Sequence, residues 1–138
     1  MAGYSCYNDG SVRDWQRHSS QIGAGKNFAG TGAFGPWLVT PDEVGPIESQ
    51  TLSTRLNGVE VQRAALADMI FGVEDLIVYF STICPLLPGD VIVAGTPGGV
   101  GLFQDPPRFL RPGDVVEVEI SNVGVVRNSV QDEGSAAH

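Results

Sequence analysis

Residues 52–63 of the chain read LSTRLNGVEVQR, and this stretch decides the fold. From Leu52 to Leu56, apolar or β-branched side chains at every second position alternate with polar ones, as in a strand with one buried face. Asn57-Gly58 interrupts the alternation, and residues 59–63 resume an extended pattern. Asn-Gly adopts the left-handed conformations that a two-residue turn between antiparallel strands requires. The stretch therefore predicts a β-hairpin.

Short strand-like segments continue on both sides of this hairpin. They lie at residues 3–8, 37–40, 91–94, 115–120 and 124–130. Pro-Gly-Asp precedes two of them, at residues 88–90 and 112–114. The 18 glycines and 9 prolines of the chain supply the tight turns that many short strands need. This pattern is typical of a rolled sheet or a barrel.

Helical signals are fewer. Ser11 can cap a short helix over residues 11–16, and residues 67–84 have apolar side chains at helical spacing, with a break near Gly72. Residues 19–36 form a loop rich in small residues. Strands and helices do not alternate, which argues against a doubly wound parallel sheet. We expect a β-rich α+β domain with a rolled, mixed, barrel-like sheet and two short helices.

The composition restricts the class of partner. The 138 residues include 42% apolar and 17% charged side chains, as in one globular domain. Sixteen acidic residues against eight basic ones give a net charge of -8, which argues against binding nucleic acid through its phosphates. The longest apolar run, residues 76–87, is too short to cross a bilayer, and no signal peptide is visible. Cys6 and Cys84 lack metal-ligand spacing, so we expect free thiols in a cytoplasmic protein.

Asp9 follows Tyr7-Asn8, where the first predicted strand meets the first predicted helix. A carboxylate beside the free N–H groups of a helix start stays ionised, because that end favours negative charge. From these residues alone two interpretations stay open. Asp9 caps the helix, or it is a ligand for a hard cation such as Mg²⁺.

Two glycine-rich stretches resemble nucleotide-binding loops but fail the pattern. Residues 95–101, GTPGGVG, are followed neither by Lys-Ser or Lys-Thr nor by a predicted helix, so they lack the groups that bind phosphates. Lys26 follows a Gly-Ala-Gly run, but Asn27 stands where a phosphate loop needs Ser or Thr. Thr96, at the end of an apolar segment, instead offers a hydroxyl suited to a substrate carboxylate.

Glu117 and Glu119 lie two residues apart on a predicted strand, so their carboxylates face the same side. Two interpretations follow. The pair chelates a divalent metal, or it belongs to the solvated face of a strand whose valines face the core.

Taken together, these motifs resemble the fumarylacetoacetate hydrolase family over nearly the whole chain, and their order and spacing make the match specific. The matching segments are residues 7–9 with Ser11, Arg13-Asp14 and Gln16; residues 25–28; residues 35–37; Asn57-Gly58 with Gln62; residues 88–90; residues 95–101; and Gly113-Asp114. We expect the C-terminal portion of a catalytic domain over residues 1–133 and a disordered tail over residues 134–138. The chain is similar to bacterial members of the 2-hydroxyhepta-2,4-diene-1,7-dioate isomerase type.

The resemblance implies a homodimer that binds Mg²⁺ or Mn²⁺, with Ca²⁺ as an alternative, and a small oxo-acid substrate. By motif position, Asp9 corresponds to a metal ligand and Lys26 to the catalytic cation that stabilises negative charge on the substrate. Arg13 and Gln16 correspond to residues beside the metal or substrate. Thr96 corresponds to the hydroxyl that binds the substrate carboxylate.

The resemblance also implies that part of the site is missing. In the family, a Glu-x-Glu pair and a lid with a catalytic His and Glu precede the segment that matches Tyr7. We therefore expect an N-terminally incomplete domain that binds metal weakly. The implied function is divalent-metal-dependent hydrolysis, isomerisation or decarboxylation of a small dicarboxylic oxo-acid or hydroxy-dienoate in the catabolism of aromatic compounds. The alternative is a truncated, catalytically inactive member that acts as a dimerising or structural module.

Overall fold

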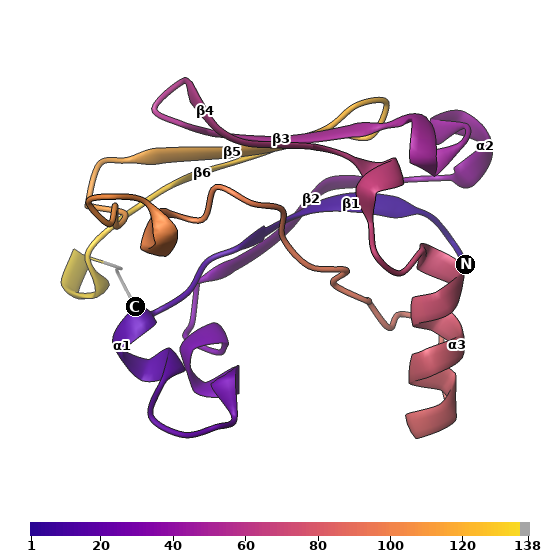
Figure 1. Ribbon diagram of the computed structural model, residues 1–138, viewed down its shortest axis with the longest axis horizontal. Helices are drawn as coiled ribbons and strands as arrows, with labels where there is room; N and C mark the ends of the chain where they lie inside the picture. Colours follow the sequence, from indigo (N-terminus) through magenta and orange to yellow (C-terminus); the bar gives the residue numbers. More distant parts are fainter. Residues whose placement is uncertain (136–138) are drawn as a thin grey trace.

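Figure 1 shows the computed structural model, which describes residues 1–135. In this part of the chain, antiparallel strands form a two-stranded ribbon of β1 and β2 and a four-stranded sheet in the order β4-β3-β5-β6. The ribbon lies against β5 and β6 of the larger sheet. The strands are β1 (Tyr4–Asp9), β2 (Gly32–Val39), β3 (Thr51–Leu56), β4 (Val59–Ala65), β5 (Val115–Ile120) and β6 (Gly124–Ser129).

The helices are short and lie outside the sheets. The α-helices are α1 (Arg13–Gln16), α2 (Pro41–Val44) and α3 (Val73–Ile83). The 3-10 helices are η1 (Ile22–Lys26), η2 (Ile47–Ser49), η3 (Leu66–Asp68), η4 (Gly101–Phe103) and η5 (Glu133–Ser135). In Figure 1, α1 and α3 extend below the sheets at opposite ends of the molecule. No helix of the described residues is long and apolar enough to cross a membrane.

The structure confirms the β-rich α+β fold expected from the sequence and corrects three local predictions. The predicted break at Gly72 is confirmed, but only the part after it, α3, is an α-helix, and the part before it forms the 3-10 helix η3. The expected loop over residues 19–36 contains η1 and the start of β2. Residues 91–94, predicted as a strand, are irregular. Of the expected disordered tail, residues 136–138 lie outside the described residues.

The Asn57-Gly58 turn forms as predicted and also fixes the pairing of β3 with β5. Asn57 has a φ of 53° and Gly58 a φ of 79°, which are the left-handed conformations of such a turn. The Asn57 side chain donates to Asp114 Oδ1 and accepts from the backbone N–H of Val115, each at 2.8 Å. The turn of one hairpin therefore holds the first residue of the next strand, so that Leu56 pairs with Val116.

Both Pro-Gly-Asp motifs form the same local structure. Asp114 Oδ2 accepts from the backbone N–H of Arg111 at 2.8 Å, and Asp90 Oδ2 accepts from that of Leu87 at the same distance. Only the second motif leads into a strand of the described residues, β5. The turn alone does not create a strand, because a strand also needs a neighbour for its backbone hydrogen bonds.

The two sheets meet at the turn between β5 and β6. The Trp37 indole N–H donates to the Val123 carbonyl at 2.6 Å, and the Cys6 thiol donates to the Gly124 carbonyl at 3.1 Å. Burial raises the pKa of the Cys6 thiol, so the group stays protonated and able to donate. The buried core around this contact consists of Cys6, Val39, Val44, Leu56, Val116, Val118, Val123 and Val126.

The helix α3 and the segment that follows it are less well covered. None of the residues of α3 is buried, although the helix is apolar, and Val78, Tyr79 and Ile83 are each more than 60% exposed. Residues 91–94 are also mostly exposed. Within the described residues the hydrophobic core therefore belongs to the two sheets and not to α3.

Asp114 predicts a specific acid sensitivity. Its hydrogen bond from Asn57, and after it the backbone N–H of Arg111, lowers the pKa of the carboxyl. A depressed pKa stabilises the fold above the unfolded value of about 4, and this stabilisation is lost as pH falls through the folded value. Asn57→Gly keeps the left-handed backbone and removes the main cause of the shift. We expect its free energy of unfolding, measured by urea titration, to fall less steeply below pH 5 than that of the wild type.

Asp114→Asn is the control, because it removes the titrating group itself and should flatten the same part of the profile. The pKa of Asp42, lowered mainly by the Thr40 hydroxyl, affects all three proteins equally and cancels from the comparison. Identical pH profiles for the wild type and Asn57→Gly would contradict this assignment.

Candidate active site

Lys26 and Asp9 form an ion pair at the end of the ribbon. β1 ends at Asp9 and η1 ends at Lys26, and the Lys26 Nζ lies 2.5 Å from Asp9 Oδ2. The two side chains are 28% and 34% exposed, so solvent reaches the pair. Lys26 is also the only lysine in the sequence. The structure thus brings together the two residues assigned as catalytic cation and metal ligand.

Gly25 allows the close packing that places Lys26. Its carbonyl accepts from the backbone N–H of Val12 at 2.9 Å, which joins η1 to the start of α1. A Cβ on Gly25 would lie 2.7 Å from the Val12 carbonyl oxygen and 2.8 Å from the Cα of Gln16. The rings of Trp15 and Phe28 meet edge to face at 5.3 Å beside this contact. The backbone approach at Gly25 therefore holds Lys26 beside Asp9.

Arg13 and Gln16 form a second polar pair, on α1. The Arg13 Nη1 donates to Gln16 Oε1, as their three-residue spacing on one helical face predicts. The Arg13 Nε is buried and has no hydrogen-bond partner within the described residues. The guanidinium is thus only partly satisfied, and it lies on an element that packs against η1.

Thr96 lies in a different cluster. Its hydroxyl oxygen is 3.1 Å from Nε2 of Gln62, which also donates to the Pro97 carbonyl at 3.0 Å. Gln62 belongs to β4, at the edge of the larger sheet. Within the described residues, no hydrogen bond or ion pair joins Thr96 to the cluster of Lys26. Four of the five predicted site residues therefore share adjoining elements, and Thr96 is anchored separately.

The described residues do not by themselves form a site for a divalent cation. They contain no group of three His, Cys, Asp or Glu side chains close enough to share a metal ion. One oxygen of Asp9 is already paired with Lys26. A single carboxylate leaves most coordination positions of Mg²⁺ or Mn²⁺ without a protein ligand.

Glu117 and Glu119 face the same side of β5, as predicted, but they pair with arginine. The Arg55 Nε lies 3.2 Å from Glu117, and its Nη1 lies 2.6 Å from Glu119. Arg55 is directly opposite Glu117 on β3, and Arg127 on β6 approaches Glu117 from the other side at 3.5 Å. The carboxylates thus form a cross-strand charge network on the outer face of the sheet, which agrees with the solvated-face interpretation.

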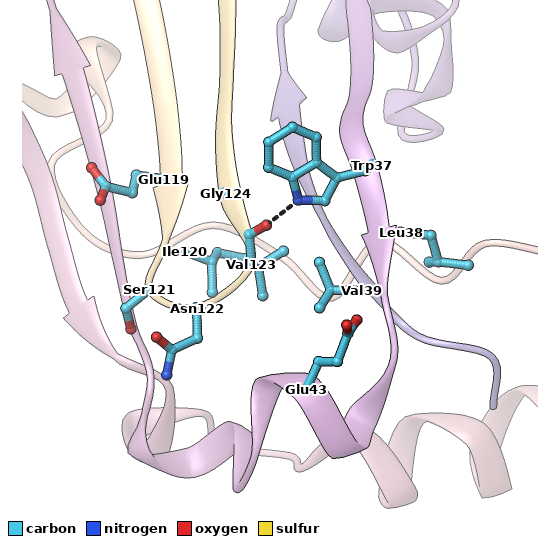
Figure 2. Close-up of a pocket in the computed structure, with 10 residues that line it drawn as sticks. All are labelled: Trp37, Leu38, Val39, Glu43, Glu119, Ile120, Ser121, Asn122, Val123 and Gly124. Atoms are coloured by element: carbon cyan, nitrogen blue, oxygen red, sulfur yellow. Dashed lines mark hydrogen bonds between the residues drawn. The ribbon is translucent and has the colours of Figure 1, made fainter.

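A hollow in the surface lies away from these residues. An open depression of about 630 Å³ lies between β2 and the β5–β6 turn. Figure 2 shows its lining residues and the Trp37–Val123 hydrogen bond beside it. Its only ionisable side chains are Glu43 and Glu119, and none of the five predicted site residues lines it. A depression with two carboxylates and no cation repels anions, so it is a poor candidate for an oxo-acid site.

Sequence reasoning missed the residues that support the candidate groups. In the sequence Gly25 stands out only as part of a motif, because its packing role depends on a contact between two separate elements. Gln62 was likewise part of the resemblance, but its contact with Thr96 spans 34 residues of sequence. Neither contact leaves a local signal in the sequence.

Comparison with known proteins gives the family. Residues 1–131 match the model of the fumarylacetoacetate (FAA) hydrolase C-terminal domain. The chain belongs to the fumarylacetoacetate hydrolase family. It is 43% identical, over 131 residues, to the mitochondrial oxaloacetate tautomerase Fahd2a of Rattus norvegicus, and this match covers 94% of the chain and 42% of the relative. The chain thus spans about two fifths of the length of the curated relatives it matches.

Solved structures of this family share the fold. The 2-hydroxyhepta-2,4-diene-1,7-dioate isomerase from Mycobacterium marinum superposes with a TM-score of 0.85 at 34% identity, covering 96% of this chain and 49% of that one. A fumarylpyruvate hydrolase from Pseudomonas aeruginosa, in complex with Mn²⁺ and pyruvate, gives 0.83 at 27% identity, covering 95% and 55%. The expected membership of an enzyme family that includes isomerases and hydrolases is confirmed.

Gly25→Ala tests the placement of Lys26. The added methyl group would meet backbone atoms of α1, so η1 must move away, and we expect a loss of about 1–3 kcal/mol in the free energy of unfolding. With ¹⁵N-labelled lysine, the single ammonium resonance of the chain should shift as the ion pair opens. Gly23→Ala is the matched control, since its Cβ would meet only Asn27 Nδ2, at 3.8 Å. Equal effects of the two substitutions would argue against this role for Gly25.

Arg55→Met tests the charge network of the outer face. It leaves Glu117 and Glu119 without their shared partner, and cross-strand charge pairs contribute up to about 1 kcal/mol each. We expect a decrease of about 1 kcal/mol in stability by urea unfolding, smaller at high salt. Arg63→Met removes a more exposed pair with Glu60 and should change stability by less than half as much. If the loss of stability in Arg55→Met did not depend on salt, packing by the arginine side chain and not its charge would be the cause.

Proposed function

We propose that the chain supplies the oxo-acid-binding side of a divalent-metal-dependent enzyme site of the fumarylacetoacetate hydrolase family. The reaction is hydrolysis, isomerisation or decarboxylation of a small oxo-acid or hydroxy-dienoate. The observation that carries this proposal is the solvent-accessible Lys26–Asp9 ion pair, held at the junction of β1, α1 and η1. A fixed ammonium group at such a position stabilises an anion that develops on a substrate, because it needs no reorganisation during the reaction.

Each of the other candidate residues has a corresponding role. The guanidinium of Arg13, held by Gln16 through Nη1, would donate to a substrate carboxylate or enolate oxygen. Thr96 is a hydroxyl donor at the surface of a second loop. Asp9 is the carboxylate that would contribute to a site for Mg²⁺ or Mn²⁺. The other carboxylates of such a site must come from outside the described residues of one chain.

Two relatives support a proposal for the substrate class. The rat relative is named an oxaloacetate tautomerase, and the Pseudomonas aeruginosa structure holds pyruvate. Oxaloacetate and pyruvate share a carboxylate next to a carbonyl, and both give an enolate when a proton is lost from the carbon on the other side of that carbonyl. We therefore propose a 2-oxo acid as the substrate, with oxaloacetate tautomerisation as the second candidate reaction beside cleavage or isomerisation in aromatic catabolism.

A non-catalytic role is the competing proposal. It is favoured by the single carboxylate at the candidate site. In that case the chain folds and acts as a dimerising or structural module, with the Lys26–Asp9 pair as a surface ion pair. The homodimer is a prediction from the family resemblance, as is the cytoplasmic location.

Oxaloacetate tautomerisation and fumarylpyruvate hydrolysis, each followed with and without Mn²⁺, distinguish the two proposals. We expect conversion of at least one substrate when the chain is assembled with the protein segment that supplies the other carboxylates. In that assembly Lys26→Met should lower kcat about 100-fold, as the loss of an electrostatic group does at other enzyme sites. Arg17→Met removes a nearby exposed cation and should leave kcat within about twofold of the wild type.

Lysine labelling gives a second readout that needs no turnover. Because Lys26 is the only lysine, its ammonium resonance reports directly on the site when pyruvate or Mn²⁺ is added. If neither ligand shifts this resonance and neither substrate is converted, the non-catalytic proposal is correct.

A further inference from the structure

Gln62 makes two hydrogen bonds through one amide nitrogen. Nε2 lies 3.1 Å from the Thr96 hydroxyl oxygen and 3.0 Å from the Pro97 carbonyl oxygen. A carbonyl oxygen can only accept, so the amide must present its NH₂ group to the loop. The same orientation makes the Thr96 oxygen the acceptor of the other bond. The side chain of Gln62 thus fixes the hydrogen-bonding direction of the Thr96 hydroxyl.

This direction suits an anionic ligand. With its oxygen accepting from Gln62, the Thr96 hydroxyl is left with its own hydrogen to donate. Thr96 is exposed, so that hydrogen can be offered to a ligand in solvent. A hydroxyl that already accepts one hydrogen bond is polarised and becomes a better donor. Such a donor forms its strongest hydrogen bond with a charged acceptor, such as a carboxylate oxygen.

The rest of the loop is held in place around Thr96. Gly99 has a φ of 99°, and a Cβ there would collide with the Val61 carbonyl oxygen of β4. The loop thus lies directly on the edge strand of the larger sheet, where only glycine allows this approach. Gln104 donates to the Gly99 carbonyl at 3.3 Å from within the loop. Gln62 is the residue that ties the hydroxyl itself to the strand.

We propose that Gln62 is a positioning residue that makes Thr96 the hydrogen-bond donor to the carboxylate of a 2-oxo acid. The inference rests on the proposed function and adds to it the residue that gives the carboxylate subsite its polarity. Gln62 itself does not touch the substrate. Replacing Gln62 should therefore change substrate affinity, and it should do so only by changing how Thr96 binds the substrate.

The test compares Gln62→Met and Gln62→Glu with the wild type in the presence of Mn²⁺. Binding of pyruvate is measured by calorimetry and turnover of oxaloacetate by steady-state kinetics. We expect Gln62→Met to weaken pyruvate binding and raise KM about tenfold, the size of one hydrogen bond to a charged group, with kcat within about twofold. Gln62→Glu should weaken binding further, because its carboxylate accepts the Thr96 hydrogen and repels the anion.

Two variants separate positioning from general support of the loop. Gln104→Met removes a hydrogen bond of the same loop that does not reach Thr96, and it should bind pyruvate within about twofold of the wild type. Thr96→Val should weaken binding as much as Gln62→Met. Combining the two substitutions should add little further loss, because both act through one hydroxyl.

The outcomes distinguish this inference from the proposed function. If the wild type neither binds pyruvate nor converts oxaloacetate, the proposed function and this inference both fail. If the wild type does bind, the inference alone is overturned by either of two results. These are unchanged affinity in Gln62→Met or fully additive losses in the double variant. Thermal unfolding of each variant checks that it is folded at the assay temperature.

Discussion

Gly124 is the point at which the two sheets meet, and its lack of a side chain sets how closely they approach. A Cβ at this position would lie 3.2 Å from the indole nitrogen of Trp37. The carbonyl of the same residue accepts from the Cys6 thiol, and the preceding carbonyl, of Val123, accepts from Trp37. Backbone groups at the end of one sheet are thus satisfied by side chains of the other, which would be costly to leave unpaired. The buried core forms around this junction.

The candidate site uses the ends of elements that this junction positions. Asp9 is the last residue of β1, and Lys26 is the last residue of η1, so both lie where regular structure gives way to loop. Loops carry functional groups well when a rigid scaffold holds their ends. Here the scaffold is the ribbon packed on the larger sheet, and Gly25 supplies the close backbone contact that turns Lys26 toward the ribbon.

Much of the fold follows from local sequence patterns. The Asn57-Gly58 turn and the strand over residues 115–120 could be predicted because turn chemistry and alternation are encoded in neighbouring residues. The strand expected over residues 91–94 does not form, for a physical reason. Its Pro-Gly-Asp turn forms as predicted, but strand pairing requires a partner, and the pattern of one segment contains no information about its neighbours.

The candidate site shows the same contrast between features encoded in one segment and contacts made between segments. The sequence indicated that Glu117 and Glu119 share a face, but the arginine between them comes from β3. The position of Asp9 indicates a candidate ligand and the family resemblance adds the role of Lys26, but the contact between the two residues depends on how α1 packs against η1. Side-chain chemistry could thus be predicted from residue types, whereas the pairing of those side chains required the tertiary structure.

Lys26 and Thr96 are carried by different sheets. Lys26 is tied to the two-stranded ribbon through Asp9, and Thr96 is tied to the four-stranded sheet through Gln62. The spacing between the two groups is therefore set by how the sheets are docked, and not by the length of either loop. A change in side-chain volume at the sheet junction, at Trp37 or Gly124, would therefore alter that spacing without touching Lys26 or Thr96. In this architecture, the packing of one sheet on the other sets the distance between the two polar groups.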